Sequence, residues 1–309
     1  MRRLQDVDLK LLRSFRSIVE AGGLVGAQAV LNVSQSTLSS QLADLEKRLD
    51  MRLCQRGRGG FALTEQGRQL LAALDDLLAA ADQFQNATAS IVGQMRGVLR
   101  LGLVDAILTN PLWDLPQILR RFNQRAPATV IELSTHNATE MQRLVLERKL
   151  DFSIGPAFQP VAGLEERPLF RERHALFCAE DHPLAGLALV DTDTLQDYPF
   201  AARSYLHRYD IGRIGQLSPA ALVDSMETQA LMIRSGAFIG FLPCHYALGL
   251  PGLARIRVMP GIDYLSPIKL RYRQDNARNM MVRSFLKRVA EQPLRTPRPG
   301  ERDVILPFD

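Results

Sequence analysis

The first fifty residues carry the hydrophobic spacing of three consecutive helices. Asp8 is placed to cap the first helix, and Ala21-Gly22-Gly23 is placed to end it. A short apolar helix is predicted over residues 24–31, and Ser34 is placed to cap a third. A helix, a short helix, a tight turn and another helix form the helix-turn-helix layout. The buried face of the first helix would consist of Leu11, Leu12, Phe15, Ile18 and Val19.

The third predicted helix has a leucine stripe and, opposite it, a flank of small and polar residues. The stripe consists of Leu38, Leu42, Leu45 and Leu49. The opposite flank consists of Ser36, Ser40, Ala43 and Lys47, with Gln35 and Ser39 near its N-terminal rim. Short polar side chains let a helix approach the major groove of DNA and still form hydrogen bonds there. The alternative is an ordinary helix with solvated serines, and periodicity alone does not separate the two.

The segment after this helix favours DNA binding. Met51, Leu53 and residues 61–63 can form two short strands around a tip that contains Arg56 and Arg58. Arginines at the apex of such a hairpin can reach phosphates or the minor groove. A helix-turn-helix followed by a basic hairpin is a winged helix-turn-helix.

A long helix capped by Thr64 follows, and its apolar residues keep a heptad spacing. This spacing favours a homodimer, and two reading heads would recognise two half-sites on DNA. The alternative is an amphipathic helix that packs on its own domain. Gly93 and Gly97 are expected to end the helix and form a hinge. The spaced residues are Leu70, Leu74, Leu77, Ala81, Phe84, Thr88 and Ile91.

The remaining two-thirds of the chain alternate between strand and helix patterns, which predicts an α/β fold with parallel sheets and crossover helices. The tail from Pro293, rich in Pro and Arg, is expected to lack fixed structure. Strands are predicted at 98–104, 130–133, 152–155, 174–179, 238–242 and 268–273. Helices are predicted at 115–123, 139–149, from a cap at Asp224 or Ser225 through Arg234, and at 281–290.

The charged residues are distributed unevenly along the chain. Of 38 Lys and Arg and 33 Asp and Glu, residues 1–60 hold 10 and 6, so most of the net charge of +5 lies at one end. A local basic excess is typical of a module that meets phosphate. No apolar run is long enough to span a membrane, and no secretory signal is present, so we expect a cytoplasmic protein without a membrane partner.

No residue pattern indicates catalysis. The sequence lacks the GxGxxG, GxxxxGK[ST], GxSxG and HExxH motifs, and its five histidines and three cysteines lack metal-ligand spacing. We therefore expect no enzyme activity, no cofactor and no metal site. A solute-binding module and an enzyme on the α/β unit are the alternatives; the missing signal sequence opposes the first and the missing motifs oppose the second.

These features resemble the LysR-type transcriptional regulators. The resemblance covers the stretch from Asp8 to Gly67, the long helix, RKLDFSIG at 148–155 and SGAFIGFLP at 235–243. It implies a winged helix-turn-helix at 1–63, a linker and dimerisation helix at 64–92, a hinge at 93–97 and an effector-binding domain at 98–292, followed by the tail at 293–309. The effector domain would resemble a periplasmic binding protein, with one subdomain at about 98–164 and 267–292 and another at about 165–266. The expected partners are an operator in double-stranded DNA, a small-molecule effector and further copies of the chain, up to a tetramer, with RNA polymerase as an additional partner.

The resemblance also assigns residues to DNA. Ser36 stands where the family often has proline, Ser40 where it often has arginine, and Cys54 where phenylalanine is usual, so the operator sequence does not follow. The matching DNA-contacting positions are Ser34, Gln35, Ser36, Thr37, Ser39, Ser40 and Gln41, with Arg56 and Arg58 in the wing, and the helix face adds Lys47.

The effector cleft implied by the resemblance lies between the two subdomains, beside the ends of strands. An aspartate at position 105 should repel a carboxylate unless Arg203 or another cation compensates it, so Asp105 is expected to hold a cationic or hydroxyl group of the effector. The alternative is that Asp105 caps a helix. The expected lining residues are Asp105, Ala106, Thr135, His136, Asn137, Thr139, Arg203 and Ser204.

Overall fold

The computed structural model describes residues 5–57, 60–91, 95–215, 218–295 and 305–306. The chain divides into two compact units, Met1–Ala81 and Asp82–Asp309. The division lies inside the long helix α4 (Glu65–Ile91), where the sequence predicts the linker. None of the described helices is long and apolar enough to cross a membrane.

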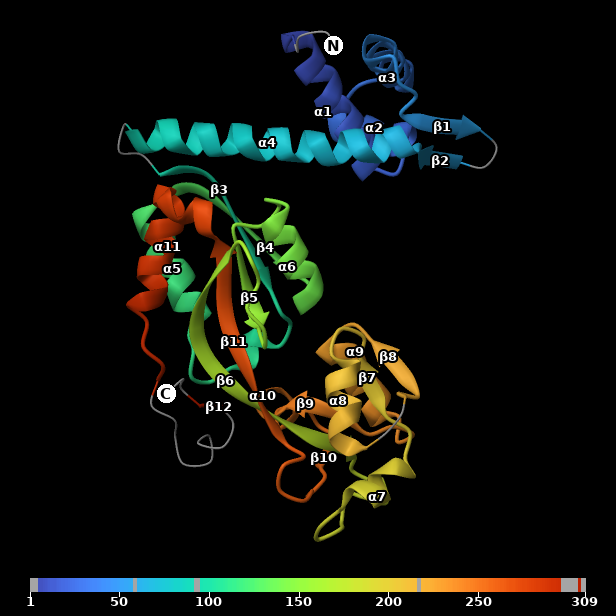
Figure 1. Cartoon of the computed structure of the whole chain (residues 1–309), viewed down its shortest axis with the longest axis vertical. Coiled ribbons are helices and arrows are strands. Elements are labelled where there is room, and N and C mark those ends of the chain that lie inside the picture. The colour runs from blue at the N-terminus through green and yellow to red at the C-terminus, as the bar shows by residue number, and fades with distance from the viewer. Residues whose placement is uncertain (1–4, 58–59, 92–94, 216–217, 296–304, 307–309) are drawn as a thin grey trace. The chain divides into compact units, whose positions relative to one another are not determined.

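The first unit is a helix-turn-helix with a two-stranded wing, as the sequence predicts (Figure 1). Helix α1 (Asp6–Glu20) starts three residues earlier than predicted, because Gln5 takes the cap position that was predicted for Asp8. Asp8 instead lies in the first turn, where its carboxylate accepts the Gln5 N–H at 2.8 Å and pairs with Arg48 at 3.0 Å. The other elements are α2 (Leu24–Leu31), α3 (Gln35–Leu49), β1 (Cys54–Gly57) and β2 (Gly60–Leu63). Met51 and Leu53, predicted to lie in the first strand, precede it.

The second unit is built on one large mixed sheet with the strand order β10-β6-β11-β5-β3-β4. Among the described strands of this sheet, β3 (Arg96–Leu103) pairs in parallel with β4 (Ala128–Thr135) and β5 (Phe152–Pro156), and the other pairs are antiparallel. The predicted parallel pairing is therefore confirmed for these three strands and wrong for the rest of the sheet. The predicted strand at 174–179 is the end of a 16-residue strand, β6 (Leu164–Ala179), which runs antiparallel to β11 (Tyr264–Arg273). β3 begins at Arg96, so part of the predicted hinge at 93–97 is strand, and residues 92–94 lie outside the described chain.

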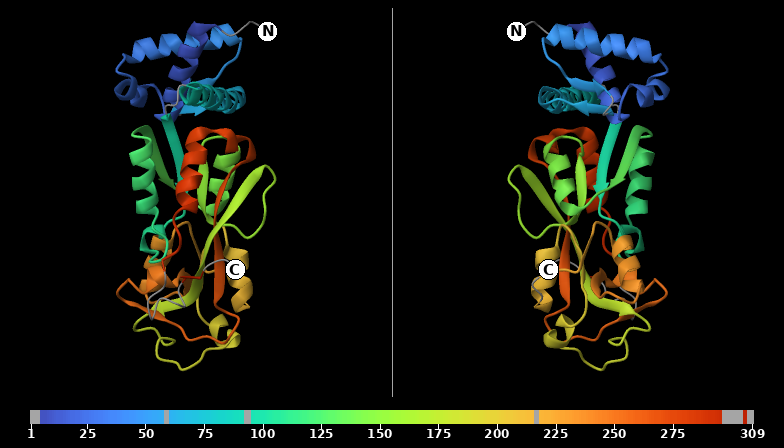
Figure 2. Two further views of the ribbon diagram at one scale, coloured as in Figure 1. Left: turned by 90° about the vertical axis from the view of Figure 1, so that its left-hand side faces the viewer. Right: turned by 90° about the vertical axis from the view of Figure 1, so that its right-hand side faces the viewer.

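Two cores form along the long strands. Phe170 of β6 and Ile268 of β11 belong to one core, whereas Leu176 of β6 and Tyr264 of β11 belong to the other. Around the first core, α5 (Leu115–Arg125) and α11 (Met280–Ala290) lie together on one face of the sheet, and α6 (Ala138–Leu146) lies on the other (Figure 2). The long strands therefore connect two halves, which matches the predicted pair of subdomains.

The second half contains several short elements that the sequence did not predict. A separate parallel pair consists of β7 (Ala201–Arg203) and β8 (Ala221–Val223). Ser225 caps α9 (Met226–Arg234) with a hydrogen bond from the Thr228 N–H, so it fills the cap position predicted for Asp224 or Ser225. The strand predicted at 238–242 is β9 (Gly240–Pro243). The other elements of the α/β unit are α7 (Thr192–Gln196), α8 (His207–Ile214), α10 (Cys244–Ala247), β10 (Leu253–Arg255) and the 3-10 turns η1 (Ile107–Thr109) and η2 (Gln274–Arg278).

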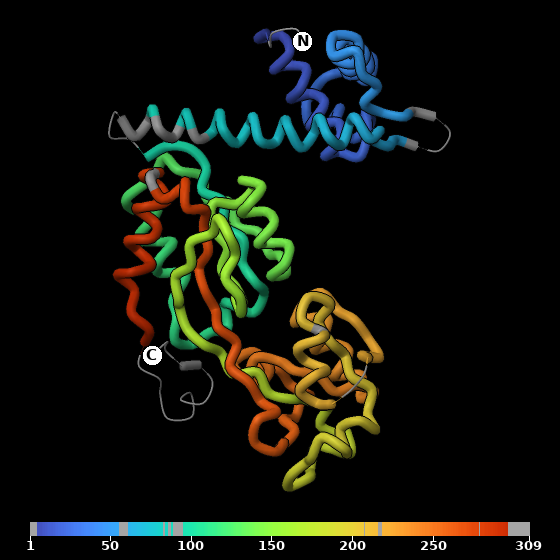
Figure 3. Tube along the Cα trace, viewed as in Figure 1, coloured from blue at the N-terminus to red at the C-terminus, as the bar shows by residue number. Residues whose placement is uncertain are grey.

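The C-terminal segment contains structure that the sequence did not predict. β12 (Ile305–Leu306) pairs antiparallel with Arg171 and Glu172 of β6. The prediction that the tail lacks fixed structure is therefore wrong for these two residues. After α11 the red trace leaves the helix without regular secondary structure (Figure 3), and the Arg295 N–H donates to the carbonyl oxygen of Leu112 at 2.8 Å.

Candidate functional site

Helix α3 has the two faces that its sequence predicts. Leu38, Leu42 and Leu45 are buried in the core of the first unit. Ser34 caps the helix, since its hydroxyl oxygen accepts the Thr37 N–H at 3.2 Å. The exposed residues of the helix include Gln35, Ser36, Thr37, Ser40, Ala43 and Lys47.

Two residues assigned to the same surface are less accessible. Ser39 is half-buried, and so is Gln41, which lines a hollow of about 510 Å³ beside α1. Lys10 and Arg13 line this hollow as well. Both are exposed cations that the sequence reasoning missed, although their spacing of three residues places them on one side of a helix.

The two strands of the predicted wing form, whereas its tip at residues 58–59 lies outside the described residues. β1 and β2 pair antiparallel from Cys54 opposite Leu63 to Gly57 opposite Gly60. Arg56 lies opposite Phe61 in this ladder, but its side chain and all of Arg58 lie outside the described residues. Their contact with DNA stays a prediction.

The heptad residues of α4 divide between two environments. Thr64 caps the helix by accepting the Gly67 N–H at 2.9 Å. Leu74 is 2% exposed and packs in the core of the first unit, and Leu70 packs partly against the same core. Leu77 and Phe84 are 38% and 70% exposed. The start of the stripe thus packs on its own domain, the alternative considered from the sequence, and only its later part presents exposed apolar surface.

The predicted effector residues divide between two hollows of the α/β unit. The larger, of about 780 Å³, is lined by Asp105, Ala106 and Thr135 among mostly apolar side chains such as Leu112, Trp113 and Leu133. The smaller, of about 310 Å³, is lined by Thr139 and by residues that the sequence did not single out, Tyr205, Leu206 and Arg271.

Asp105 is held by the other half of the unit. Its carboxylate accepts a hydrogen bond from the N–H of Met226, the first residue of α9. Burial raises the pKa of Asp105, and this hydrogen bond and the charge of Arg203 oppose the rise only in part. Asp105 therefore does bond to a helix N-terminus, the alternative role, but the helix is distant in sequence.

Arg203 and Ser204 do not line either hollow, which corrects the sequence prediction. The Arg203 side chain is 1% exposed and pairs with Asp210 at 3.0 Å. It also donates to the hydroxyl of Tyr264, which donates to Asp210 at 2.9 Å. Burial alone would lower the pKa of Arg203, but the negative charge of Asp210 outweighs this effect and raises the pKa. Ser204 donates its hydroxyl proton to Asp224.

His136 and Asn137 also lie apart from the lining of both hollows. Asn137 caps α6 by accepting the Glu140 N–H at 2.9 Å. The ring of His136 lies 2.9 Å from the Ser134 hydroxyl and 3.3 Å from the Glu140 carboxylate. Both residues organise the turn between β4 and α6.

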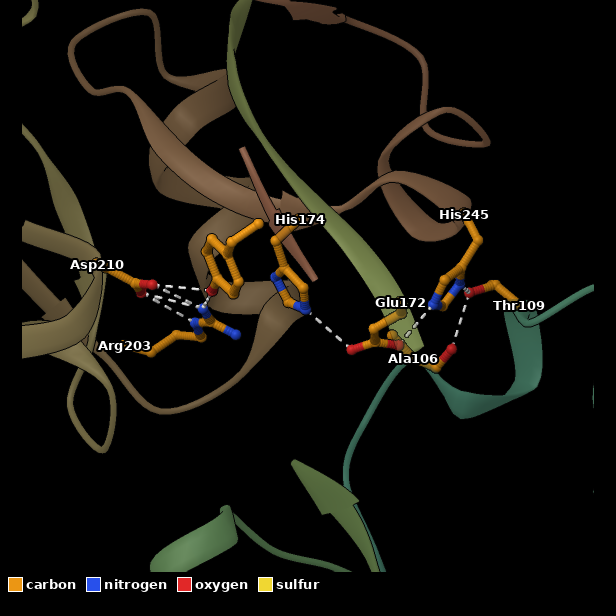
Figure 4. A network of polar contacts seen from close by, with 8 residues as sticks. Ala106, Thr109, Glu172, His174, Arg203, Asp210 and His245 are labelled. Atoms are coloured by element: carbon orange, nitrogen blue, oxygen red, sulfur yellow. Dashed lines mark hydrogen bonds and ion pairs between the residues drawn. The ribbon is translucent and has the colours of Figure 1, made fainter. Parts of the chain in front are cut away.

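A chain of polar contacts that is buried except at Thr109 lies beside the larger hollow and was not predicted (Figure 4). Glu172 of β6 lies 2.9 Å from Nε2 of His174 and 3.0 Å from Nε2 of His245. Nδ1 of His245 lies 2.8 Å from the hydroxyl of Thr109, which donates to the carbonyl oxygen of Ala106 at 2.8 Å. The one available signal was that Glu172 and His174, two positions apart on a strand, share a face.

Known proteins match the chain along nearly its full length. Residues 9–68 match the model of the bacterial regulatory helix-turn-helix protein of the lysR family, and residues 93–293 match the LysR substrate binding domain. The HTH-type transcriptional activator BauR of Pseudomonas aeruginosa is 33% identical over 295 residues, which are 93% of this chain and 96% of the relative. A probable hydrogen peroxide-inducible genes activator of Mycobacterium avium is 32% identical over 61% of this chain and 60% of its own length.

Solved structures share the fold. The LysR family transcriptional regulator CbnR has a TM-score of 0.65 at 18% identity, covering 92% of this chain and 98% of CbnR. Full-length CbnR complexed with its target DNA also has a TM-score of 0.65, at 20% identity and the same coverage. At these identities the likeness concerns the fold alone.

Proposed function

Because the chain belongs to the LysR family of DNA-binding transcriptional regulators with an effector-binding domain, we propose that it reads its operator with the exposed flank of α3. The observation that carries this proposal is the position of Ser36, Ser40 and Lys47, exposed on the side opposite the buried leucines. Small side chains allow close approach to base edges in the major groove, and Lys47 can pair with a phosphate. The proposed contact set also includes Ser34, Gln35, Thr37, Ser39 and Gln41, with Arg56 and Arg58 on the wing.

Contacts to the DNA phosphates would come from cations around this face of α3. Lys10 and Arg13, which are exposed on α1, extend the basic surface of the first unit. We propose that a homodimer forms through the later part of α4, where Phe84 is exposed, and that dimers associate into a tetramer in the cytoplasm. RNA polymerase is the partner through which such a protein would alter transcription.

The proposed effector site is the larger hollow beside Asp105. Its apolar walls suit an apolar ligand body. Partial burial raises the pKa of Asp105, and its neighbours compensate the carboxylate charge only in part. An effector with an amine or a hydroxyl group would supply a donor to that carboxylate, whereas a plain monocarboxylate would be repelled.

Two experiments test the proposal. Genomic fragments selected by the purified full chain should come from a few sites with paired half-sites, and random recovery would oppose operator binding. Isothermal titration of the full chain with aliphatic amines, amino alcohols and simple monocarboxylates tests the effector class. Tight binding of a plain monocarboxylate would contradict the role of Asp105.

A further inference from the structure

The proton positions around Thr109 follow from its contacts. Its hydroxyl group has one proton and lies 2.8 Å from both the Ala106 carbonyl oxygen and Nδ1 of His245. A carbonyl oxygen can only accept, so the hydroxyl donates to Ala106. Thr109 can then only accept from His245, which places a proton on Nδ1.

The second ring nitrogen of His245 also carries a proton. Nε2 lies 3.0 Å from the carboxylate of Glu172. Burial alone would raise the pKa of Glu172, but hydrogen bonds from His174 and His245 outweigh it and hold the pKa well below its usual range. The ionised carboxylate accepts from Nε2, so His245 is an imidazolium paired with a buried anion.

His174 completes the proton count as the neutral ring. Its Nε2 lies 2.9 Å from Glu172, whereas its buried Nδ1 has no hydrogen-bond partner in the described part of the chain. Burial lowers the pKa of His174, although the bond to Glu172 opposes this. A neutral His174 leaves only a ring nitrogen without a partner. A protonated His174 would bury a second cation with an unpaired N–H, which costs more free energy.

We propose that Thr109, His245 and Glu172 form a charge-dependent clasp, which fastens the segment after β3 to strand β6 only while His245 carries both protons. The fastened segment includes Ala106, whose φ of 63° is unusual for a residue with a side chain. This segment lines the larger hollow, and within it Asp105 accepts a hydrogen bond from the first N–H of α9. The Nδ1 proton is the donor to Thr109, so this one contact holds a wall of the hollow in place.

Other ionisable groups surround the clasp. The charges that act on Glu172 are its two histidines, and Glu172 in turn acts on Asp105 from the segment after β3. The ring of His174 stacks on Tyr264 of β11. Next to these rings, Arg203 and Asp210 form an ion pair in which the two charges neutralise each other. Around His174, these groups are Glu172 on its own strand, Arg203 on β7, Asp210 on α8 and Tyr264 on β11.

Hydrogen exchange of the full chain tests the clasp without DNA or effector, so its outcome is independent of the proposed function. Thr109 is exposed, so Thr109→Val should fold while losing the acceptor for His245. We expect amides of residues 105–110 to exchange roughly tenfold faster in this variant, after correction for intrinsic rates, as befits one hydrogen bond to a charged group. Thr109→Ser should keep the wild-type rates. Ser235→Ala is the matched control, because Ser235 makes the same hydroxyl contact to a carbonyl three residues earlier, at 2.6 Å.

Nitrogen NMR of the histidine rings supplies the second readout. In the wild type both ring nitrogens of His245 should carry protons while residues 105–110 are protected, with the Nδ1 proton donated to Thr109. In Thr109→Val the protection of this segment should no longer depend on that proton. A neutral His245 in the protected state, or unchanged exchange in Thr109→Val, would overturn the proposal.

Discussion

Glu166 joins the two long strands of the α/β unit through two cations. Its carboxylate on β6 lies 2.7 Å from Nζ of Lys269 and 2.7 Å from Nε of Arg271, both on β11. Burial would raise the pKa of Glu166, but these hydrogen bonds outweigh it and lower the pKa. The side chain is 16% exposed, so water screens the pair only in part.

Glu166→Gln should therefore lower the free energy of unfolding by about 1–2 kcal/mol at neutral pH, the range of a hydrogen-bonded charge that is partly buried. Because the folded pKa lies below the unfolded value near 4.5, this stabilisation is present above that pH and is lost as the pH falls through the folded pKa. Urea unfolding of both proteins at several pH values measures the difference. The exposed neighbour Glu165→Gln is the control, and an equal loss there would refute the pairing.

At the scale of elements, the spacing of apolar residues predicted the helices and strands that bury one face against their sequence neighbours. α3 was predictable because its leucines repeat every three or four residues on one buried face. β6 was not, because its first half reads LEERPLFRE, with charges that pair across to β11 and hide the strand pattern. The strands β7 and β8 have three residues each, too few to show a period.

The heptad spacing of helix α4 did not show where the environment of its apolar residues changes along the helix. Leu74 lies in the core of the first unit, whereas Phe84 is 70% exposed. Phe84→Glu should therefore convert the assembly to smaller species, because a charge would be buried in the proposed seam, without lowering the thermal stability of the first unit. Light scattering of the purified chain measures the mass. Gln85→Glu adds the same charge one residue further on and should leave the mass unchanged; equal effects of the two substitutions would argue against the seam.

At the scale of the whole molecule, the sequence identified the two kinds of unit but not which side chains line the hollows of the α/β unit. Asp105 was predicted to lie beside the effector and does line a hollow, yet it also bonds to α9. Arg203 was assigned to the cleft and is instead enclosed with Asp210 and Tyr264. Contacts between residues more than a hundred positions apart, such as Thr109 with His245, leave no local pattern in a single sequence.

The most direct measurement is the affinity of the full chain for a selected genomic fragment, taken by fluorescence anisotropy over a series of salt concentrations. The wild type should show log affinity falling linearly with log salt, because phosphate contacts release counterions. Ser40→Glu should bind at least roughly a hundredfold more weakly at each salt concentration, since it places a carboxylate against the duplex. Gln117→Glu, which adds the same charge in the first turn of α5, should bind like the wild type. Affinity that ignores salt, or an undiminished affinity in Ser40→Glu, would contradict recognition by this face of α3.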